Sequence, residues 1–149
     1  MKKKIIFLSL IIFLLFITSN VKALDYEIDS YDVDIVVNKN NTFDITETID
    51  AYFNTHKHGI IRKIPLKNQI RRLDGTITNN KVKIENVSVD NEFREYKEGN
   101  YYVIKIGSSS STVIGSKNYV IKYNYNLGKD PLKDKDELYF NIIGNEWDT

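Results

Sequence analysis

Two side chains of opposite charge, Glu47 and Arg62, are the strongest candidates for a specific interaction in this sequence. Apolar residues occupy the odd positions of residues 43–53, as in a strand that turns one face toward a core. Glu47 lies on that apolar face, and Arg62 lies among isoleucines in the segment Gly59–Pro65. Because an unpaired buried carboxylate is costly, we expect Glu47 and Arg62 to form a bidentate ion pair that holds this segment against the sheet.

Two other interpretations of Glu47 and Arg62 are open at this point. A bulge in the strand would turn Glu47 to solvent, where it would need no partner. A functional pocket built on the pair would instead use its charges to bind a ligand. The three interpretations differ in the burial they require of Glu47.

A second group of residues carries metal-ligand chemistry. His56 and His58 lie two apart, a spacing that puts both imidazoles on one face of a strand. The sequence places no third ligand beside them, so an exposed polar loop is the favoured interpretation. Four acidic residues could offer oxygen ligands to calcium, but interleaved lysines and the lack of EF-hand spacing favour a solvated loop. These four are Asp130, Asp134, Asp136 and Glu137. We predict no metal and no cofactor.

Aromatic residues are candidates for a glycan-binding or peptide-binding surface. Tyr119, Tyr123 and Tyr125 share one face of the alternating stretch 119–127, and Trp147 follows later. Tyrosines at such positions more often pack in a core, but these three with Trp147 form the candidate ligand surface. The sequence contains no nucleophilic-serine motif and no glycine-rich phosphate loop, and therefore we do not predict an enzyme.

The elements that position these residues read as short strands separated by turns. Residues 26–37 and 43–53 alternate in polarity around an asparagine-rich turn, which predicts an antiparallel hairpin. The second of these strands is expected to end at Asn54. Further strands or short extended segments are expected at 60–64, 76–78, 81–89 with a bulge near Glu85 and Asn86, 92–97 paired with 101–106, 119–127, and 137–143. No long helical period follows residue 24. The predicted fold is all-β, an antiparallel β-sandwich of Ig-like character.

The first 23 residues have the pattern of a signal peptide. Three lysines precede the apolar run Ile5–Ile17, and small residues lead to a cleavage site after Ala23. Cleavage there would leave residues 24–149 as an exported domain; an uncleaved N-terminal anchor is the alternative. Cleavage would also remove four lysines and no acidic residue, so that the formal charge of the chain falls from +1 to −3. A mildly acidic chain does not suit nucleic acid, and a chain without cysteine cannot use thiol catalysis.

Four segments, in this order, resemble one family. They are V-D-I-V-V at 33–37, I-T-E-T-I at 45–49, H-G-I-I-R-K-I-P at 58–65, and the late pair Y-x-I-x-Y at 119–123 with E-L-Y-F-N-I-I-G-N-E-W at 137–147. Together they are similar to the extracytoplasmic domain of the predicted membrane proteins called domain of unknown function 2207. The resemblance implies a bacterial protein with a signal peptide, an exported β-rich domain and later transmembrane helices. Because this chain stops at Thr149, we expect its domain to be incomplete at the C-terminus.

The predicted function is therefore non-catalytic. We expect the extracytoplasmic domain of a bacterial cell-envelope protein, which engages an envelope protein, a glycan or the missing remainder of its own chain. Its link to the membrane rests on the family resemblance. The alternative is a secreted ligand-binding module for glycan or peptide, built on the tyrosines and Trp147.

Overall fold

The structure is a computed structural model that describes residues 24–72 and 75–129. Within these ranges the chain forms nine strands and no helix, and all strand pairs are antiparallel, which confirms the all-β prediction. The strands are β1 (Tyr26–Val37), β2 (Thr42–Lys57), β3 (Ile60–Pro65), β4 (Lys67–Arg71), β5 (Ile77–Lys81), β6 (Lys83–Val89), β7 (Phe93–Glu98), β8 (Tyr101–Ile106) and β9 (Val113–Asn126). The predicted signal peptide, the predicted strand 137–143, the four acidic residues from Asp130 to Glu137 and Trp147 lie outside the described residues.

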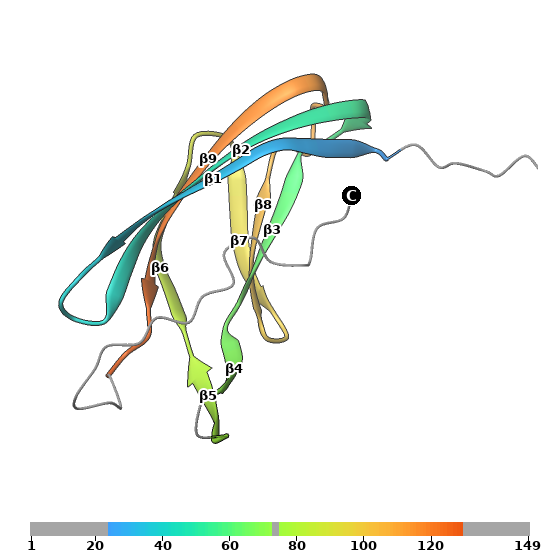
Figure 1. The fold of residues 1–149 in the computed structure, drawn as a ribbon. Helices are drawn as coiled ribbons and strands as arrows, with labels where there is room; N and C mark the ends of the chain where they lie inside the picture. The colour runs from blue at the N-terminus through green and yellow to red at the C-terminus, as the bar shows by residue number, and fades with distance from the viewer. Residues whose placement is uncertain (1–23, 73–74, 130–149) are drawn as a thin grey trace, which may run out of the picture.

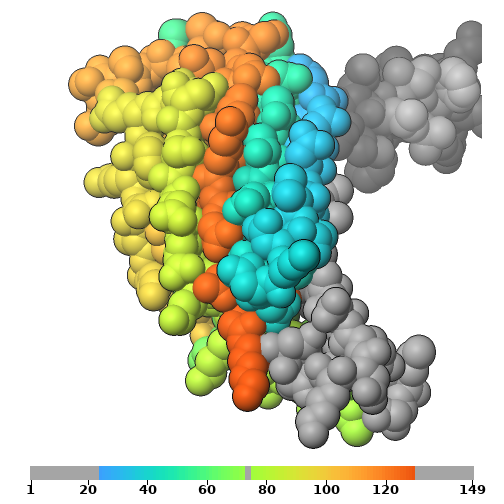
Figure 2. Space-filling view, turned by 90° about the vertical axis from the view of Figure 1, so that its left-hand side faces the viewer, coloured from blue at the N-terminus to red at the C-terminus, as the bar shows by residue number. Residues whose placement is uncertain are grey.

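The strands form three sheets. One has four strands in the order β1-β2-β9-β6, a second has three in the order β3-β8-β7, and β4 pairs with β5 alone. In Figure 1 the long strands β1, β2 and β9 cross over β7, β8 and β3, while β4 and β5 extend away from both sheets. Figure 2 shows the face of the four-stranded sheet, where β6, β9, β2 and β1 lie side by side in that order.

The β1–β2 hairpin is the predicted one, and its pairing runs from Tyr26 opposite Phe53 to Val37 opposite Phe43. A register shift between Ile28 and Ser30 marks a bulge. Strand β2 also pairs with β9 along nearly its whole length, so that it lies in the centre of the sheet. The bulge expected near Glu85 and Asn86 is present, since the β6–β9 register shifts between Glu85 and Ser88.

Strand β2 is longer than its sequence indicates. We expected it to end at Asn54, but it continues to Lys57 and pairs there with Val113 of β9 after a register shift. The residues of this extension are exposed or half-buried. Their polar side chains are typical of a loop, yet backbone pairing with a neighbouring strand does not depend on apolar side chains. The prediction failed because it used burial as the signal for a strand.

One hydrophobic core is shared by the two larger sheets. The odd residues of β2 face inward as predicted, and they meet side chains from β3, β8 and β9. The fully buried members include Ile49 and Phe53 of β2, Ile64 of β3, Ile104 of β8 and Ile121 of β9. Since the chain has no cysteine, this core rather than disulfides must stabilise the domain.

The turn before β3 passes very close to the end of β8. Gly59 and Gly107 lie beside the Ile60–Ile106 pair, with φ angles of +136° and +121°. A Cβ atom on Gly59 would overlap the carbonyl oxygen of Ile106, and one on Gly107 would overlap that of His58. The two segments therefore touch backbone to backbone, and only glycine fits at either position.

We predict that Gly59→Ala and Gly107→Ala each lower the free energy of unfolding by roughly 2 kcal/mol or more, because a backbone clash adds to the strain of a positive φ. Urea unfolding followed by circular dichroism would measure this. Gly115→Ala is the matched control: its φ is +73° and no atom lies within 4 Å of the added Cβ. The control should lose only about 1 kcal/mol. Equal losses at all three positions would show that the close contact adds nothing.

Candidate functional site

The structure brings Glu47 and Arg62 together between the two larger sheets. Arg62 Nε donates to Glu47 Oε2 over 2.8 Å, and Arg62 Nη2 donates to Glu47 Oε1 over 2.9 Å. Glu47 lies on β2 and Arg62 on β3, and the two residues are 0% and 1% exposed. The interpretation in which a bulge turns Glu47 to solvent is therefore wrong. The observed geometry is the parallel, two-bond pairing that suits guanidinium and carboxylate.

Three further groups complete this buried cluster. The Tyr123 hydroxyl donates to Glu47 Oε1 over 2.6 Å, and Arg62 Nη1 donates to the Lys63 carbonyl oxygen over 2.9 Å. The Arg62 guanidinium carbon also lies 6.0 Å from the centre of the Tyr31 ring. Tyr31 and Tyr123 lie on strands β1 and β9, at positions diagonal to Glu47 on either side. Strands β1, β2, β3 and β9 thus all contribute to one polar cluster, which we call the Glu47–Arg62 cluster.

The cluster holds charged and neutral groups in fixed states. Burial raises the pKa of Tyr123 well above its ordinary value, and the negative charge of Glu47 raises it further. Burial and Glu47 raise the pKa of Tyr31 in the same way. For Arg62, burial acts to lower the pKa, but hydrogen bonding and attraction to Glu47 outweigh it and raise the pKa. The tyrosines therefore stay protonated and Arg62 stays charged at neutral pH.

The arrangement of this cluster suits structure rather than catalysis. Both oxygens of Glu47 accept hydrogen bonds from Arg62, and one accepts a further bond from Tyr123. With Glu47 0% exposed, a ligand would have to break these bonds and open the core to reach the carboxylate. The cluster therefore acts as a polar connection between the sheets.

The candidate tyrosine surface is not available to a ligand. Tyr119, Tyr123 and Tyr125 are 1%, 3% and 1% exposed, so that all three belong to the core. Tyr125 accepts a hydrogen bond from Asn68 Nδ2 over 3.1 Å, whereas the buried Tyr119 hydroxyl has no partner within the part of the chain that the structure describes. The three tyrosines share one face of β9 as predicted, and the favoured interpretation, that they pack in the core, is confirmed. Trp147, the fourth residue of the proposed surface, lies outside the described residues.

The two histidines contact the serine-rich loop at residues 107–112. His58 Nδ1 lies 3.0 Å from the Ser108 carbonyl oxygen and 2.9 Å from that of Ser111, and therefore this nitrogen carries the proton and donates. His56 Nδ1 lies 3.1 Å from Thr112 Oγ1. Among the described residues no group of three or more His, Asp or Glu side chains is arranged to hold a metal ion. We expected both histidines in an exposed polar loop. Both are exposed, but the loop prediction is wrong for His56, which belongs to strand β2.

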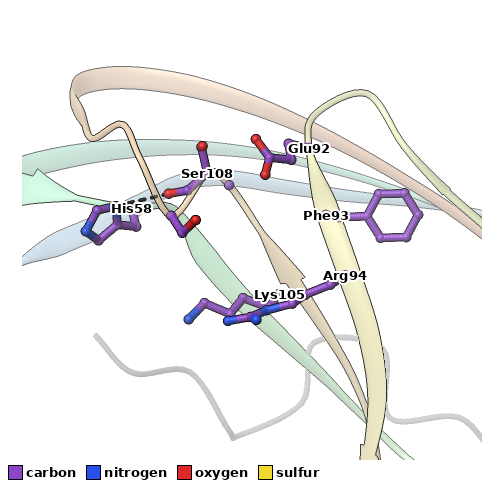
Figure 3. Close-up of a pocket in the computed structure, with 8 residues that line it drawn as sticks. His58, Glu92, Phe93, Arg94, Lys105 and Ser108 are labelled. Atoms are coloured by element: carbon purple, nitrogen blue, oxygen red, sulfur yellow. Dashed lines mark hydrogen bonds between the residues drawn. The ribbon is translucent and has the colours of Figure 1, made fainter.

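A shallow pocket of about 240 Å³ opens beside this loop (Figure 3). Its wall carries Arg94 of β7 and Lys105 of β8, which are direct partners in the antiparallel pair and point the same way in Figure 3. Glu92, Ser108 and His58 line its other side, while the Phe93 ring points away from it. We call this site the Arg94–Lys105 pocket.

Sequence reasoning missed the Arg94–Lys105 pocket, although part of its signal was present. The predicted hairpin has a two-residue connection at Gly99 and Asn100, and such a turn fixes the register. That register places residue 94 opposite residue 105. The path of the serine-rich loop after β8 could not be read from the sequence, because it depends on contacts with His58 and Gly59, which are distant in the chain.

A second polar group lies on the outer face of the four-stranded sheet. Asp50 accepts hydrogen bonds from Ser30 Oγ and Asn118 Nδ2, at 2.8 and 2.7 Å. Asp44 accepts bonds from Asn38 and Asn124 in the same manner, at 3.0 and 2.9 Å. The amide of Asn118 lowers the pKa of Asp50, and Asn38 lowers that of Asp44. These bonds join strands across the sheet and leave the carboxylates already satisfied, so the group reads as support for strand register.

We predict that Glu47→Gln and Arg62→Leu each lower the free energy of unfolding by about 3–5 kcal/mol, because each leaves a buried group without its partner. The double variant should lose clearly less than the sum of the two. Urea unfolding of the four proteins of this cycle measures the coupling. Additive losses would contradict a specific pair. The exposed Lys57–Asp25 pair offers a control cycle, in which each single loss should be within about 1 kcal/mol.

Alkaline pH should destabilise the protein through its buried tyrosines. Free tyrosine ionises near pH 10, while burial raises the pKa of Tyr125 to about 12 and that of Tyr123 further. Their contribution to stability is complete below pH 10 and is lost as pH rises through the folded-state values. Urea unfolding between pH 8 and 11.5 should show this decline, and Tyr123→Phe should reduce its slope. Tyr52→Phe, at an exposed position of β2, should leave the slope unchanged.

Comparison with known protein families gave a match over most of the chain. Residues 27–149 match the model of a family described as "Predicted membrane protein (DUF2207) N-terminal domain". Neither the curated proteins nor the solved structures gave a match. In the described ranges the structure contains no helix with the length and apolar character needed to cross a bilayer. The family match covers most of the chain, and the resemblance noted from its sequence segments is confirmed: this chain belongs to the DUF2207 family of predicted membrane proteins, in the N-terminal domain of that family.

Proposed function

We propose that this chain is the extracytoplasmic domain of a bacterial envelope membrane protein and that its role is to engage another envelope component. The observation that carries the proposal is the family match over residues 27–149, because the family is described as the N-terminal domain of predicted membrane proteins. The leader-like pattern of the first 23 residues supports an exported location for the rest of the chain. The absence of cysteine from the chain is compatible with that location.

The proposed role is non-catalytic. Glu47 and Arg62, the two buried charged residues in the described part of the chain, bind each other and neighbouring groups rather than facing a cavity. The described histidines bond to main-chain and hydroxyl oxygens of one loop. These contacts support a non-catalytic role for these residues, since a catalytic group must reach its substrate. We include in the proposal the two-sheet sandwich of Ig-like character, which the core shared by the larger sheets supports.

The proposed location can be tested with a single introduced thiol, because the chain has no cysteine. Lys39 and Lys67 lie at exposed positions. We predict that Lys67→Cys, expressed in full-length protein in intact bacterial cells, reacts with a membrane-impermeant maleimide without cell lysis. Mass spectrometry of the purified protein would measure the labelled fraction. Labelling that appears only after lysis would refute the extracytoplasmic location.

A buried position supplies the matched control for this experiment. Ala51 is 1% exposed and similar in size to cysteine. Ala51→Cys should stay unlabelled in intact and in lysed cells and should react only after denaturation. This result shows that labelling of Lys67→Cys reports the side of the membrane and not unfolded protein. Lys39→Cys, on the turn between β1 and β2, should behave as Lys67→Cys does.

A further inference from the structure

The Arg94–Lys105 pocket contains an electrostatic conflict. Arg94 and Lys105 are direct cross-strand partners, and like charges in that relation destabilise a sheet. Neither residue forms an ion pair with Glu92 or with any other residue in the described ranges. The nearby Lys63, by contrast, pairs with Glu98 over 3.5 Å. Among the described residues no carboxylate pairs with either cation, so that the two charges face a concave surface together, which is a cost in the free protein and an advantage for binding an anion.

The rest of the pocket supplies polar groups from a different part of the chain. His58 donates to two carbonyl oxygens of the serine-rich loop and so holds Ser108 at the rim. The backbone N–H of Gly107 donates to the Glu92 carbonyl oxygen over 2.7 Å and ties this loop to the start of β7. The loop is thus held in place beside the cations before any ligand is bound. Preorganisation of this kind reduces the entropy lost on binding.

We propose that the Arg94–Lys105 pocket binds a phosphate ester group. A tetrahedral phosphate accepts hydrogen bonds from several directions, and the pocket offers a guanidinium from β7 and an ammonium from β8, beside the serines of the loop after β8. A volume of about 240 Å³ admits a phosphate with a small alcohol attached. Among the described residues that line the pocket, Glu92 is the one acidic residue, and it disfavours ligands that carry further anionic groups on its side.

The inference deepens the proposed function by giving the chemistry of the component to be engaged, and it rests on that function for its biological meaning. At a membrane surface the phosphate ester is either the headgroup of an anionic lipid or a soluble phosphate ester. The chemistry in the pocket is the same for both, so that the experiment needs one arm for each source.

The first arm titrates the full chain, in detergent, with glycerol 1-phosphate and follows backbone amide signals by NMR. We expect saturable shifts at residues 92–94 and 105–109, and a dissociation constant at least about 10-fold higher for R94Q/K105Q, which lacks both charge-assisted donors. The charge-matched control K39Q/K67Q removes two cations at exposed positions elsewhere and should bind as wild type does. Equal affinity of wild type and R94Q/K105Q would overturn the proposal, as would equal affinity for acetate.

Stability measurements separate a lost site from a lost fold. Since R94Q/K105Q removes a repulsion between opposed cations, it should unfold at the same temperature as wild type or higher in phosphate-free buffer. Glycerol 1-phosphate should raise the unfolding temperature of wild type and leave that of R94Q/K105Q unchanged. A stabilisation of both proteins by the same amount would also overturn the proposal.

The second arm compares sedimentation of the same proteins with vesicles of phosphatidylcholine alone and of phosphatidylcholine with phosphatidylglycerol. All variants keep the same N-terminal apolar segment, so that differences between them isolate the pocket. Weaker binding of R94Q/K105Q than of K39Q/K67Q to the anionic vesicles assigns the lipid headgroup as the source. Equal vesicle binding, together with a difference in the first arm, assigns a soluble ester. The first arm does not depend on where the protein is located, and therefore its failure is distinguishable from failure of the maleimide experiment.

Discussion

The pairing of Glu47 with Arg62 is the constraint on which the arrangement of this domain depends. Burying either charge without a partner would lower the stability of the core. The two charges can pair only if β2 and β3 face one another at one relative position. Apolar side chains permit many ways of packing two sheets, because their contacts are not directional. The two parallel hydrogen bonds of this pair permit far fewer. The tyrosines on β1 and β9 extend the same restriction to the neighbouring strands.

Much of the four-stranded sheet could be predicted from the sequence, because alternation reports directly on half-buried strands. The β1–β2 hairpin, the inward face of β2 and the bulge in β6 all have local signals. The Glu47–Arg62 pair was also accessible, since a lone carboxylate on an apolar face needs a partner and Arg62 was the nearest cation among apolar neighbours. The odd position of Glu47 among the apolar residues of β2 was enough to predict its burial, and the order of the strands was not needed.

The features that sequence reasoning missed depend on contacts between distant segments. The hydrogen bond from Asn68 to Tyr125 joins residues 57 positions apart, and no local pattern indicates it. The end of β2 was misplaced because its last residues pair with β9 beyond the edge of the core. The alternation of β1 assigns Tyr31 to the inner face. Its contact with Arg62 could not be predicted, because that contact depends on where β3 lies in the fold. The Arg94–Lys105 pocket requires the serine-rich loop to fold onto His58, about 50 residues away in the chain, which no local pattern indicates.

The backbone contact between Gly59 and Gly107 has a consequence for how this domain can vary in evolution. One wall of the pocket is shaped by main-chain atoms that meet without intervening side chains, and these positions cannot change without a clash. The charge of the pocket comes from Arg94 and Lys105, which lie outside the core and outside that contact. Shape and charge are therefore encoded by separate residues. Descendants of this chain could alter what the pocket attracts through two substitutions while the scaffold that forms it stays intact.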